Sequence, residues 1–174
     1  MRWYKQFDID MPITLADTCN QYTENNPPEP PYNYDFMEDS TMWIIWNNDD
    51  VSSQLNDVRE LISHTAGVEV DDEVGFVVVW RYDEKFNRSP VHIDYGRDNG
   101  GKQNGSVCTA ISGDLKIHLH ADDADKTIID TVHVTSNTVI ALNNTKFYHS
   151  VEGHGDLIIF GVNLDTDPEE YWHD

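Results

Sequence analysis

The chain has 174 residues, which suits one domain with a sizeable hydrophobic core. Its hydrophobic fraction of 39%, with 11% aromatic residues, is typical of a folded globular protein and excludes a disordered chain. A formal net charge of −21 argues against nucleic-acid backbones and anionic membranes as partners, because both would repel the protein. We therefore expect a small-molecule or peptide substrate, and the charge favours a neutral or cationic one.

The cysteines and the N-terminus give no sign of secretion. Cys19 and Cys108 supply neither a disulfide framework nor a Cys-x-x-Cys metal motif. The first residues, MRWYKQFDIDMP, lack the unbroken apolar stretch of a signal peptide, and no apolar run approaches the roughly 20 residues that span a bilayer. These features predict a cytoplasmic protein.

We expect residues 1–70 to form an irregular arm followed by one helix. The segment PPEPPYNY, residues 27–34, is too rich in proline for a helix or a central strand, so it predicts an extended arm. The segment 50–67 has the periodicity of an amphipathic helix, with Asp50 as a suitable N-cap and Gly67 as a suitable end. This helix, alone or with a second one, is expected to cover one face of the β-sheet that follows.

From residue 75 onward the pattern changes to short strands rich in β-branched and aromatic residues, separated by Gly, Asn, Asp or Pro. The spacing leaves no room for helical crossovers. The predicted strands are 75–82, 90–95, 106–112, 115–121, 126–134, 138–143, 147–152 and 156–164. They predict a mainly β protein, an antiparallel two-sheet jelly roll, in a single domain spanning 1–174 with its β core at 75–166.

Histidine and an acidic residue occur two positions apart three times in the chain. The pairs are His92/Asp94, His120/Asp122 and His154/Asp156. With so many acidic residues, about one or two such pairs arise by chance, so only their context separates them. The first pair lies inside predicted strand 90–95, where residues i and i+2 point to the same face. The second and third pairs fall in a solvated turn and a glycine-flanked loop, and we expect neither to bind metal.

An iron site of the two-histidine, one-carboxylate type requires one further imidazole beside the first pair. His149, near the start of predicted strand 147–152, is the best candidate. Three such ligands occupy one face of an octahedron and leave positions open for a cosubstrate and oxygen. The pattern therefore indicates His92, Asp94 and His149 as candidate metal ligands and as the candidate catalytic centre.

Two segments around these residues resemble a known family. The motif PVHIDYG, followed by TSNTVIALNNTKFYHSVEG, resembles the Fe(II)/2-oxoglutarate-dependent oxygenase superfamily. The segment DLIIFGVNLDTDPEEY resembles, more loosely, the closing strand of aspartyl/asparaginyl β-hydroxylase-type members. The resemblance spans 75–166. It implies a double-stranded β-helix, hydroxylase activity, Fe(II) held by His92, Asp94 and His149, and 2-oxoglutarate as cosubstrate.

The sequence departs from this family at the cosubstrate. Its members usually carry an arginine on the last strand, whose planar fork grips the distal carboxylate of 2-oxoglutarate. Here residues 152–166 contain no arginine or lysine, and Leu157 lies at about the expected position. Some members use a lysine on an earlier strand instead. That precedent makes Lys116 the first candidate for the cosubstrate carboxylate, with Arg97 and Arg81 behind it.

Two alternatives remain open at this point. The sequence HLH at 118–120 resembles the His-x-His of cupins, which would make His118, His120 and His149 the metal ligands, although the expected glutamate is missing. The function would then be that of a cupin-type metal protein or enzyme that does not use 2-oxoglutarate. The missing arginine also suits a non-catalytic β-helix binding module.

Overall fold

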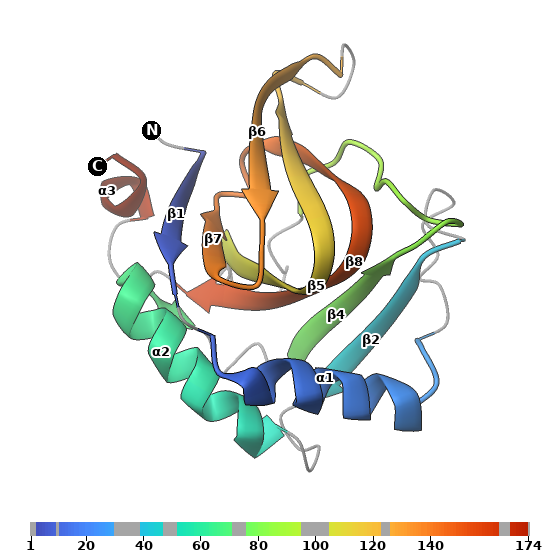
Figure 1. The fold of residues 1–174 in the computed structure, drawn as a ribbon. Coiled ribbons are helices and arrows are strands. Elements are labelled where there is room, and N and C mark those ends of the chain that lie inside the picture. Colours follow the sequence, from blue (N-terminus) through green and yellow to red (C-terminus); the bar gives the residue numbers. More distant parts are fainter. Residues whose placement is uncertain are drawn as a thin grey trace.

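The fold was obtained as a computed structural model, and it describes residues 3–9, 11–29, 39–46, 52–70, 76–94, 105–122, 126–163 and 168–173. The elements in chain order are β1 (Tyr4–Asp8), α1 (Ile13–Asn25), β2 (Thr41–Trp46), η1 (Ser52–Leu55), α2 (Asn56–Ala66), β3 (Glu69–Val70), β4 (Phe76–Tyr82), β5 (Gly105–His120), β6 (Ile128–Val134), β7 (Thr138–Leu142), β8 (Tyr148–Asn163) and α3 (Pro168–His173). All named strands pair antiparallel and belong to one curled sheet (Figure 1). The mainly β, jelly-roll fold class is confirmed.

Two long strands, β5 and β8, organise the sheet. They pair along their whole length, from Gly105 opposite Val162 to His120 opposite Tyr148. The first half of β5 continues through β7 to β1, and the second half of β8 continues through β4 to β2. The other halves of β5 and β8 form a smaller layer with β6 at its edge. The long strands therefore link the two layers between which the candidate site lies.

Glycines at one corner explain why four predicted strands are only two. Predicted strands 106–112 and 115–121 are both part of β5, and 147–152 and 156–164 are both part of β8. Gly113 has φ 86° and Gly155 has φ 139°, a backbone region that side chains with a Cβ rarely adopt. A Cβ on Gly113 would lie 2.0 Å from the His154 carbonyl oxygen. These glycines bend β5 and β8 without interrupting the pairing between them. From the sequence, the same glycines were interpreted as turns at which the strands end.

The N-terminal prediction of an irregular arm was wrong for most of its described residues. β1 extends the sheet by pairing with β7, and β2 pairs with β4 along its whole length. Helix α1 has Pro12 at its N-cap and no side-chain capping hydrogen bond, so it lacks the usual sequence signals. Burial of Leu15 and Cys19 against the sheet stabilises it instead. Of the proline-rich segment only residues 27–29 are described, and they are irregular.

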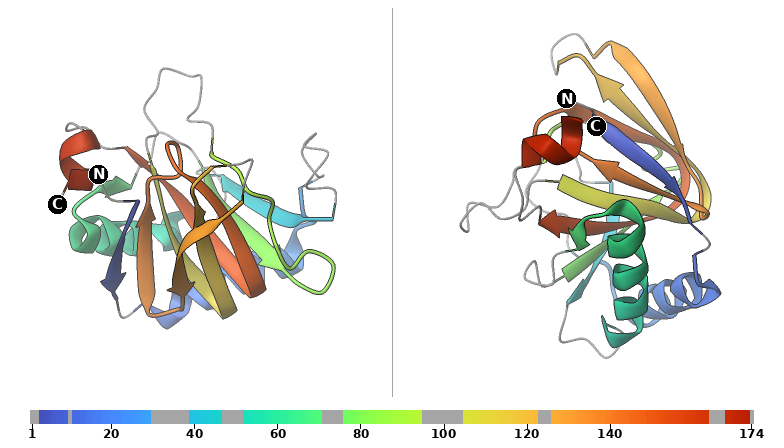
Figure 2. Two further views of the ribbon diagram at one scale, coloured as in Figure 1. Left: turned by 90° about the horizontal axis from the view of Figure 1, so that it is seen from above. Right: turned by 90° about the vertical axis from the view of Figure 1, so that its left-hand side faces the viewer.

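The predicted covering helix is present as α2, preceded by the single 3-10 turn η1. Its end is as predicted: Gly67 has φ 65°, and its N–H donates to the Ser63 carbonyl at 3.0 Å. Val58 and Ile62 are buried beneath it. The suggested cap Asp50 lies outside the described residues. Helices α1 and α2 lie together on one side of the larger layer (Figure 2).

The two faces of the curled sheet carry two hydrophobic clusters. The cluster beneath α1 and α2, which we call the outer cluster, includes Leu15, Cys19, Val58, Ile62, Val77, Val79, Val107, Ile158 and Phe160. The cluster between the layers, the inner cluster, includes Tyr82, Phe86, Cys108, Ala110, Leu115, Ile117, Leu119, Val132, Ile140, Leu142, Val151 and Leu157. We call the two faces of the sheet inner and outer accordingly. Within the described part of the chain, no helix has the length and apolar character needed to cross a membrane.

Candidate metal centre

The segment that carries His92 and Asp94 runs beside the first half of β8. It is not the regular strand 90–95 that the sequence predicted, because only isolated bridges connect it to β8. The His92 N–H donates to the His149 carbonyl at 3.0 Å, and the His149 N–H donates to the His92 carbonyl at 2.8 Å. Pro90 interrupts the segment because it has no N–H to donate. This reciprocal backbone pair fixes the two histidines directly opposite each other.

Strand register places the three predicted ligands together on the inner face. His149 lies opposite Leu119, which belongs to the inner cluster, and directly opposite residues share a face of the sheet. His92 lies opposite His149, and Asp94 follows two positions later. One potential ligand atom from each of His92, Asp94 and His149 lies within 4.8 Å of the other two. The structure therefore brings together the residues that the sequence singled out.

The orientation of the two imidazole rings leaves one nitrogen of each available to a metal. The ring centroids are 4.4 Å apart, and His92 Nε2 lies 3.3 Å from Asp94 Oδ1. His92 Nδ1 lies 2.8 Å from the Pro90 carbonyl oxygen, and His149 Nδ1 lies 3.4 Å from that of Phe147. A carbonyl oxygen only accepts, so each Nδ1 carries a proton. Nε2 of His149 therefore presents its lone pair, whereas Nε2 of His92 faces the Asp94 carboxylate, a contact that favours a proton on that nitrogen until a metal replaces it. Backbone carbonyls of this kind orient metal-binding histidines.

Burial and mutual charge set the protonation of the three groups. Burial lowers the pKa of His149 to about 4, despite the favourable charge of Asp94, so its imidazole is neutral at pH 7. Burial also acts to lower the pKa of His92, but the hydrogen bond and charge of Asp94 outweigh it and raise that pKa. Burial acts to raise the pKa of Asp94, yet His92 and the nearby polar groups lower it. An ionised carboxylate beside a neutral imidazole is the donor set that a divalent metal requires.

Asn144, which the sequence did not indicate, contacts Asp94, and Ser106 in turn contacts Asn144. Asn144 Nδ2 donates to Asp94 Oδ2 and, at 2.7 Å, to Ser106 Oγ. The Asp94 N–H in turn donates to the Asn144 carbonyl at 2.8 Å. The only sequence signal for Asn144 is its place in the Asn-Asn turn before His149, which suggested an ordinary polar turn.

Of the three candidates for binding the cosubstrate carboxylate, Lys116 and Arg81 are described by the structure, and both face away from this centre. Lys116 lies opposite Glu152 and alternates with the inner-facing Leu115 and Ile117, so its side chain is on the outer face. Arg97 lies outside the described residues. Leu157, at the position where the family places its arginine, is buried in the inner cluster. The structure thus does not bring Lys116 to the three clustered side chains.

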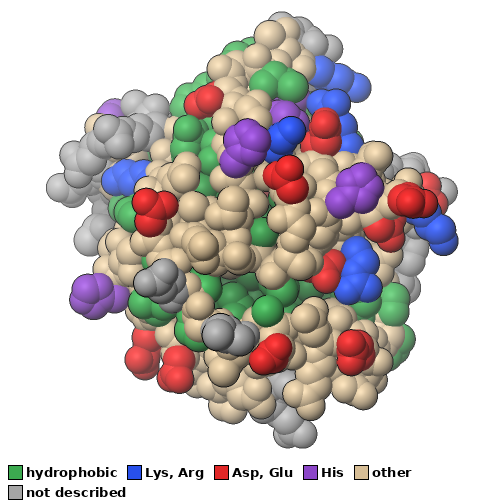
Figure 3. All heavy atoms as spheres, viewed as in Figure 1, with side chains coloured by type: hydrophobic (Ala, Val, Ile, Leu, Met, Phe, Trp, Pro, Cys, Tyr) green, Lys and Arg blue, Asp and Glu red, His purple; other side chains and the backbone are tan. Residues whose placement is uncertain are grey.

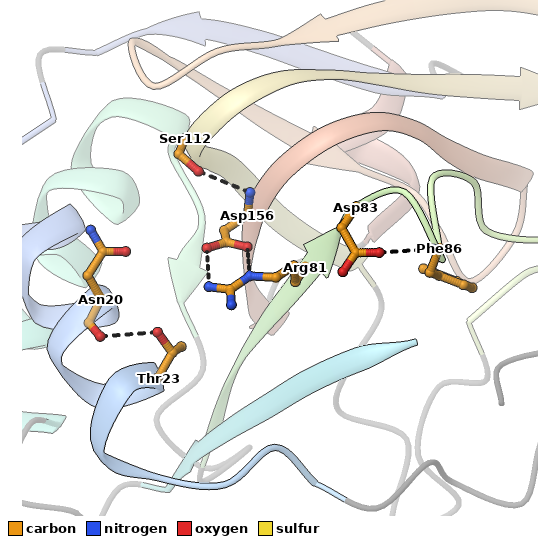
Figure 4. A network of polar contacts seen from close by, with 7 residues as sticks. All are labelled: Asn20, Thr23, Arg81, Asp83, Phe86, Ser112 and Asp156. Atoms are coloured by element: carbon orange, nitrogen blue, oxygen red, sulfur yellow. Dashed lines mark hydrogen bonds and ion pairs between the residues drawn. The ribbon is translucent and has the colours of Figure 1, made fainter. Parts of the chain in front are cut away.

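Arg81 is held on the outer face by an ion pair. Its Nε lies 2.8 Å from Asp156 Oδ1 and its second nitrogen lies 2.9 Å from Oδ2, a bidentate contact (Figure 4). The guanidinium also lies over the Trp43 ring, 4.8 Å from its centroid. Asp156 was expected in an exposed loop, but it lies within β8 and is buried. Arg81 is therefore a structural residue and not a ligand of the site.

The cupin-type set of His118, His120 and His149 is contradicted by strand register. Leu119 shares the inner face with His149, so its neighbours on either side point to the outer face. His120 is fully buried and not a surface residue as expected, although Ala121 and Asp122 after it are exposed, as the predicted solvated turn requires. Its Nδ1 lies 3.0 Å from the Lys126 carbonyl oxygen, and its Nε2 lies 2.9 Å from Ser150 Oγ. Both ring nitrogens are already hydrogen-bonded within the protein.

The outer face of the smaller layer has a different chemical character. His118 Nε2 and Arg88 lie 3.5 and 3.4 Å from Glu152 Oε2. A hollow of about 430 Å³ lies beside them, lined by Lys116, Glu152, His154 and other residues of the same two strands. Figure 3 shows histidine, basic and acidic side chains interspersed on the face where β6 lies. Cationic and anionic groups therefore neutralise one another there.

The fold and the cluster together define a double-stranded β-helix with a His-x-Asp…His centre on its inner face. No protein-family model matches the chain, and no curated protein matches it. Among solved structures, it is similar to a Pseudomonas putida prolyl-4-hydroxylase, with TM-score 0.57 and 13% identity, covering 94% of each chain. It is also similar to a Trichoplax adhaerens prolyl hydroxylase in complex with a peptide fragment of the hypoxia inducible factor oxygen degradation domain.

For that second structure the TM-score is 0.58 and the identity 9%, and the match covers 98% of this chain and 86% of the other. At identities this low, the likeness to the two structures shows a shared fold and nothing further. At that level it confirms the double-stranded β-helix that the sequence motifs implied.

Proposed function

We propose that this protein is a non-haem Fe(II)- and 2-oxoglutarate-dependent oxygenase that hydroxylates a small-molecule or peptide substrate. The observation that carries the proposal is the cluster of His92, Asp94 and His149 on the inner face of the sheet. A likeness of fold to two prolyl hydroxylases supports it. The acidic net charge of −21 favours a neutral or cationic substrate over an anionic one.

The donor set suits Fe(II). Two neutral imidazole nitrogens and one carboxylate oxygen are the ligands of oxygenase iron sites, and they leave positions open for a cosubstrate. His92 and His149 would bind through Nε2, because each Nδ1 is directed at a backbone carbonyl. Asp94 would bind through Oδ1, the oxygen that faces His92. When bound, Fe(II) supplies the oxygen chemistry that hydroxylation of an unactivated C–H bond requires.

The protein's own part is to orient these ligands and to shield His149 from water. The reciprocal backbone hydrogen bonds hold His92 and His149 opposite each other before any metal arrives. His149 is only 5% exposed, and the inner cluster lies behind it. Its low pKa means that no proton has to leave His149 when a metal binds at pH 7. A preorganised site of this kind lowers the cost of binding.

We propose Arg97 as the residue that binds the distal carboxylate of 2-oxoglutarate. Lys116 and Arg81, the other two candidates, both face outward, whereas Arg97 follows closely after Asp94 in the sequence. An arginine fork matches a carboxylate in geometry and charge. Replacing Arg97 with alanine is therefore expected to weaken 2-oxoglutarate binding without affecting the binding of metal alone.

A second candidate function has one observation in its favour. The inner-facing residues of β8 where the family places its basic residue, Leu157 and Ile159, are both apolar. A carboxylate placed against them would lose its hydration without gaining a counter-charge. This favours a metal-dependent enzyme that uses the same three ligands without 2-oxoglutarate.

Anaerobic titration with Fe(II), with and without 2-oxoglutarate, distinguishes the two functions. A visible charge-transfer band that appears only when both are present supports the proposed oxygenase, and succinate, which lacks the keto group, serves as the matched control. Metal binding that is indifferent to 2-oxoglutarate favours the second function. Failure to bind Fe(II) at all contradicts both and leaves a non-catalytic binding module.

A further inference from the structure

Asp94 is held at two points by a single residue, Asn144. The Asp94 N–H donates to the Asn144 carbonyl at 2.8 Å, and the Asn144 side-chain amide donates to Asp94 Oδ2. The opposite carboxylate oxygen, Oδ1, is the one that lies 3.3 Å from His92 Nε2. The two oxygens of one carboxylate thus face different partners.

We propose that Asn144 is a positioning residue that fixes Asp94 as a monodentate metal ligand, with Oδ1 toward the histidines and Oδ2 held by the amide. The inference rests on the proposed function, because it assumes that the cluster binds a metal. Asp94 has a side chain that is 41% exposed, so packing alone does not fix its rotation. A hydrogen bond to one oxygen does so, and it keeps that oxygen from occupying a second coordination position.

The direction of the Asn144 amide follows from its partners. If the amide were reversed, its carbonyl oxygen would face the Asp94 carboxylate, and two acceptors would meet without a proton between them. With Nδ2 toward Asp94, one hydrogen serves Asp94 and the other serves Ser106. The amide oxygen Oδ1 is then buried without a hydrogen-bond partner among the residues that the structure describes. A buried acceptor left unpaired indicates that this orientation is required by Asp94.

Ser106 connects this contact to the rigid part of the sheet. It lies in β5 opposite Leu142 of β7, and Asn144 follows Leu142 by two positions, so both polar side chains share the inner face. Ser106 is 3% exposed and Asn144 is 1% exposed. Two buried side chains, Ser106 and Asn144, therefore connect Asp94 to β5 through hydrogen bonds.

The test uses the full chain with Co(II) alone as the probe, since Co(II) binds the same ligands and has visible absorption bands that report its coordination number. Asn144→Ala is expected to weaken Co(II) binding about 10- to 100-fold, the usual effect of removing a residue that orients a ligand. The bands should also change, because a freed Asp94 can bind through both oxygens. Asn143→Ala is the matched control: Asn143 is adjacent and equally buried, and within the described part of the chain its side-chain amide has no hydrogen-bond partner.

The outcomes separate this inference from the proposed function. Co(II) binding by Asn144→Ala with the original Kd and spectrum overturns the positioning role and leaves the proposed function intact. Equal losses in Asn143→Ala and Asn144→Ala also overturn it, since they indicate a general effect on the turn. No Co(II) binding by the unaltered protein overturns both. If Asn144→Ala fails to fold, Ser106→Ala decides: a weaker affinity with altered bands supports the role, and an unchanged affinity and spectrum contradicts it.

Discussion

His149 and His120 lie on neighbouring strands of one sheet, yet their imidazole rings point to opposite faces of it. On the inner face, His149 and His92 each have one nitrogen directed at a backbone carbonyl and one directed at the other ligands. On the outer face, both nitrogens of His120 are engaged, by the Lys126 carbonyl and by Ser150. The two regions use the same side chain for different purposes.

This difference shows that spacing along the chain does not identify a metal ligand. His118 and His120 are spaced as well as His92 and Asp94 for a shared site, but they lie on the wrong face for His149. Successive side chains of a strand point to opposite faces, and this alternation decides which side chains meet. The hydrogen bonds of the imidazole ring then decide whether one nitrogen has a lone pair available for a metal. The following predictions test this distinction between the inner and outer faces.

Removal of an inner-face ligand should have the largest effect. We expect His149→Ala to weaken Co(II) binding by more than about 100-fold, beyond the loss typical of residues that only orient a ligand. The fold should survive, since the protein no longer has to bury an imidazole there. Isothermal titration calorimetry measures the affinity, and binding at the original Kd would show that His149 is not a ligand.

The equivalent change on the outer face should affect stability and not metal binding. His120→Ala removes two buried hydrogen bonds and leaves Ser150 unpaired, so the free energy of unfolding should fall by about 2–3 kcal/mol. Urea unfolding followed by circular dichroism measures it. A large loss of Co(II) affinity in the folded His120→Ala protein would contradict the assignment of the outer face.

The outer-face ion pair should contribute less. Arg81→Ala leaves the buried Asp156 without its bidentate partner, but Arg81 itself is 39% exposed and its charge is screened by water. We expect the free energy of unfolding to fall by about 1–2 kcal/mol, with the affinity for 2-oxoglutarate unchanged. Arg88→Ala is the matched control, because its pair with Glu152 is exposed on both sides and should contribute under about 1 kcal/mol.

Lys116 should matter least. Its side chain lies on the outer face, so Lys116→Ala should change the free energy of unfolding by no more than about 0.5 kcal/mol. The affinity for 2-oxoglutarate, read from the charge-transfer band, should equal that of the unaltered protein. A clear weakening would mean that Lys116 reaches the inner face and that the register argument fails for this residue.

Most of the sheet after residue 75 and the candidate ligands followed from the sequence because they depend on local patterns. Short segments rich in β-branched and aromatic residues predicted the jelly roll, and the position of His92 and Asp94 between apolar residues indicated a shared face. Gly67 was correctly predicted to end α2, since a left-handed residue is required there.

What the sequence could not reveal depends on contacts between distant segments. Gly113 and Gly155 suggested turns, but they face each other across β5 and β8 and allow a bend without a break. β1, with the sequence YKQFD, has no distinctive pattern and is a strand because β7 pairs with it. β2, with the sequence TMWIIW, is rich in β-branched and aromatic residues, but it follows the proline-rich segment and was interpreted as part of the arm until β4 was seen to pair with it. Asn144 looked like any turn residue until the fold placed it beside Asp94.

Anomalous diffraction from crystals soaked in Co(II) tests whether His92, Asp94 and His149 form a metal site. We expect one strong peak on the inner face, within bonding distance of Nε2 of His92, Nε2 of His149 and Oδ1 of Asp94. Crystals of His149→Ala should lack that peak, and crystals of His120→Ala should retain it. A peak beside His118 and Glu152 on the outer face, with none at the three clustered side chains, would show that the metal site lies on the opposite face of the sheet.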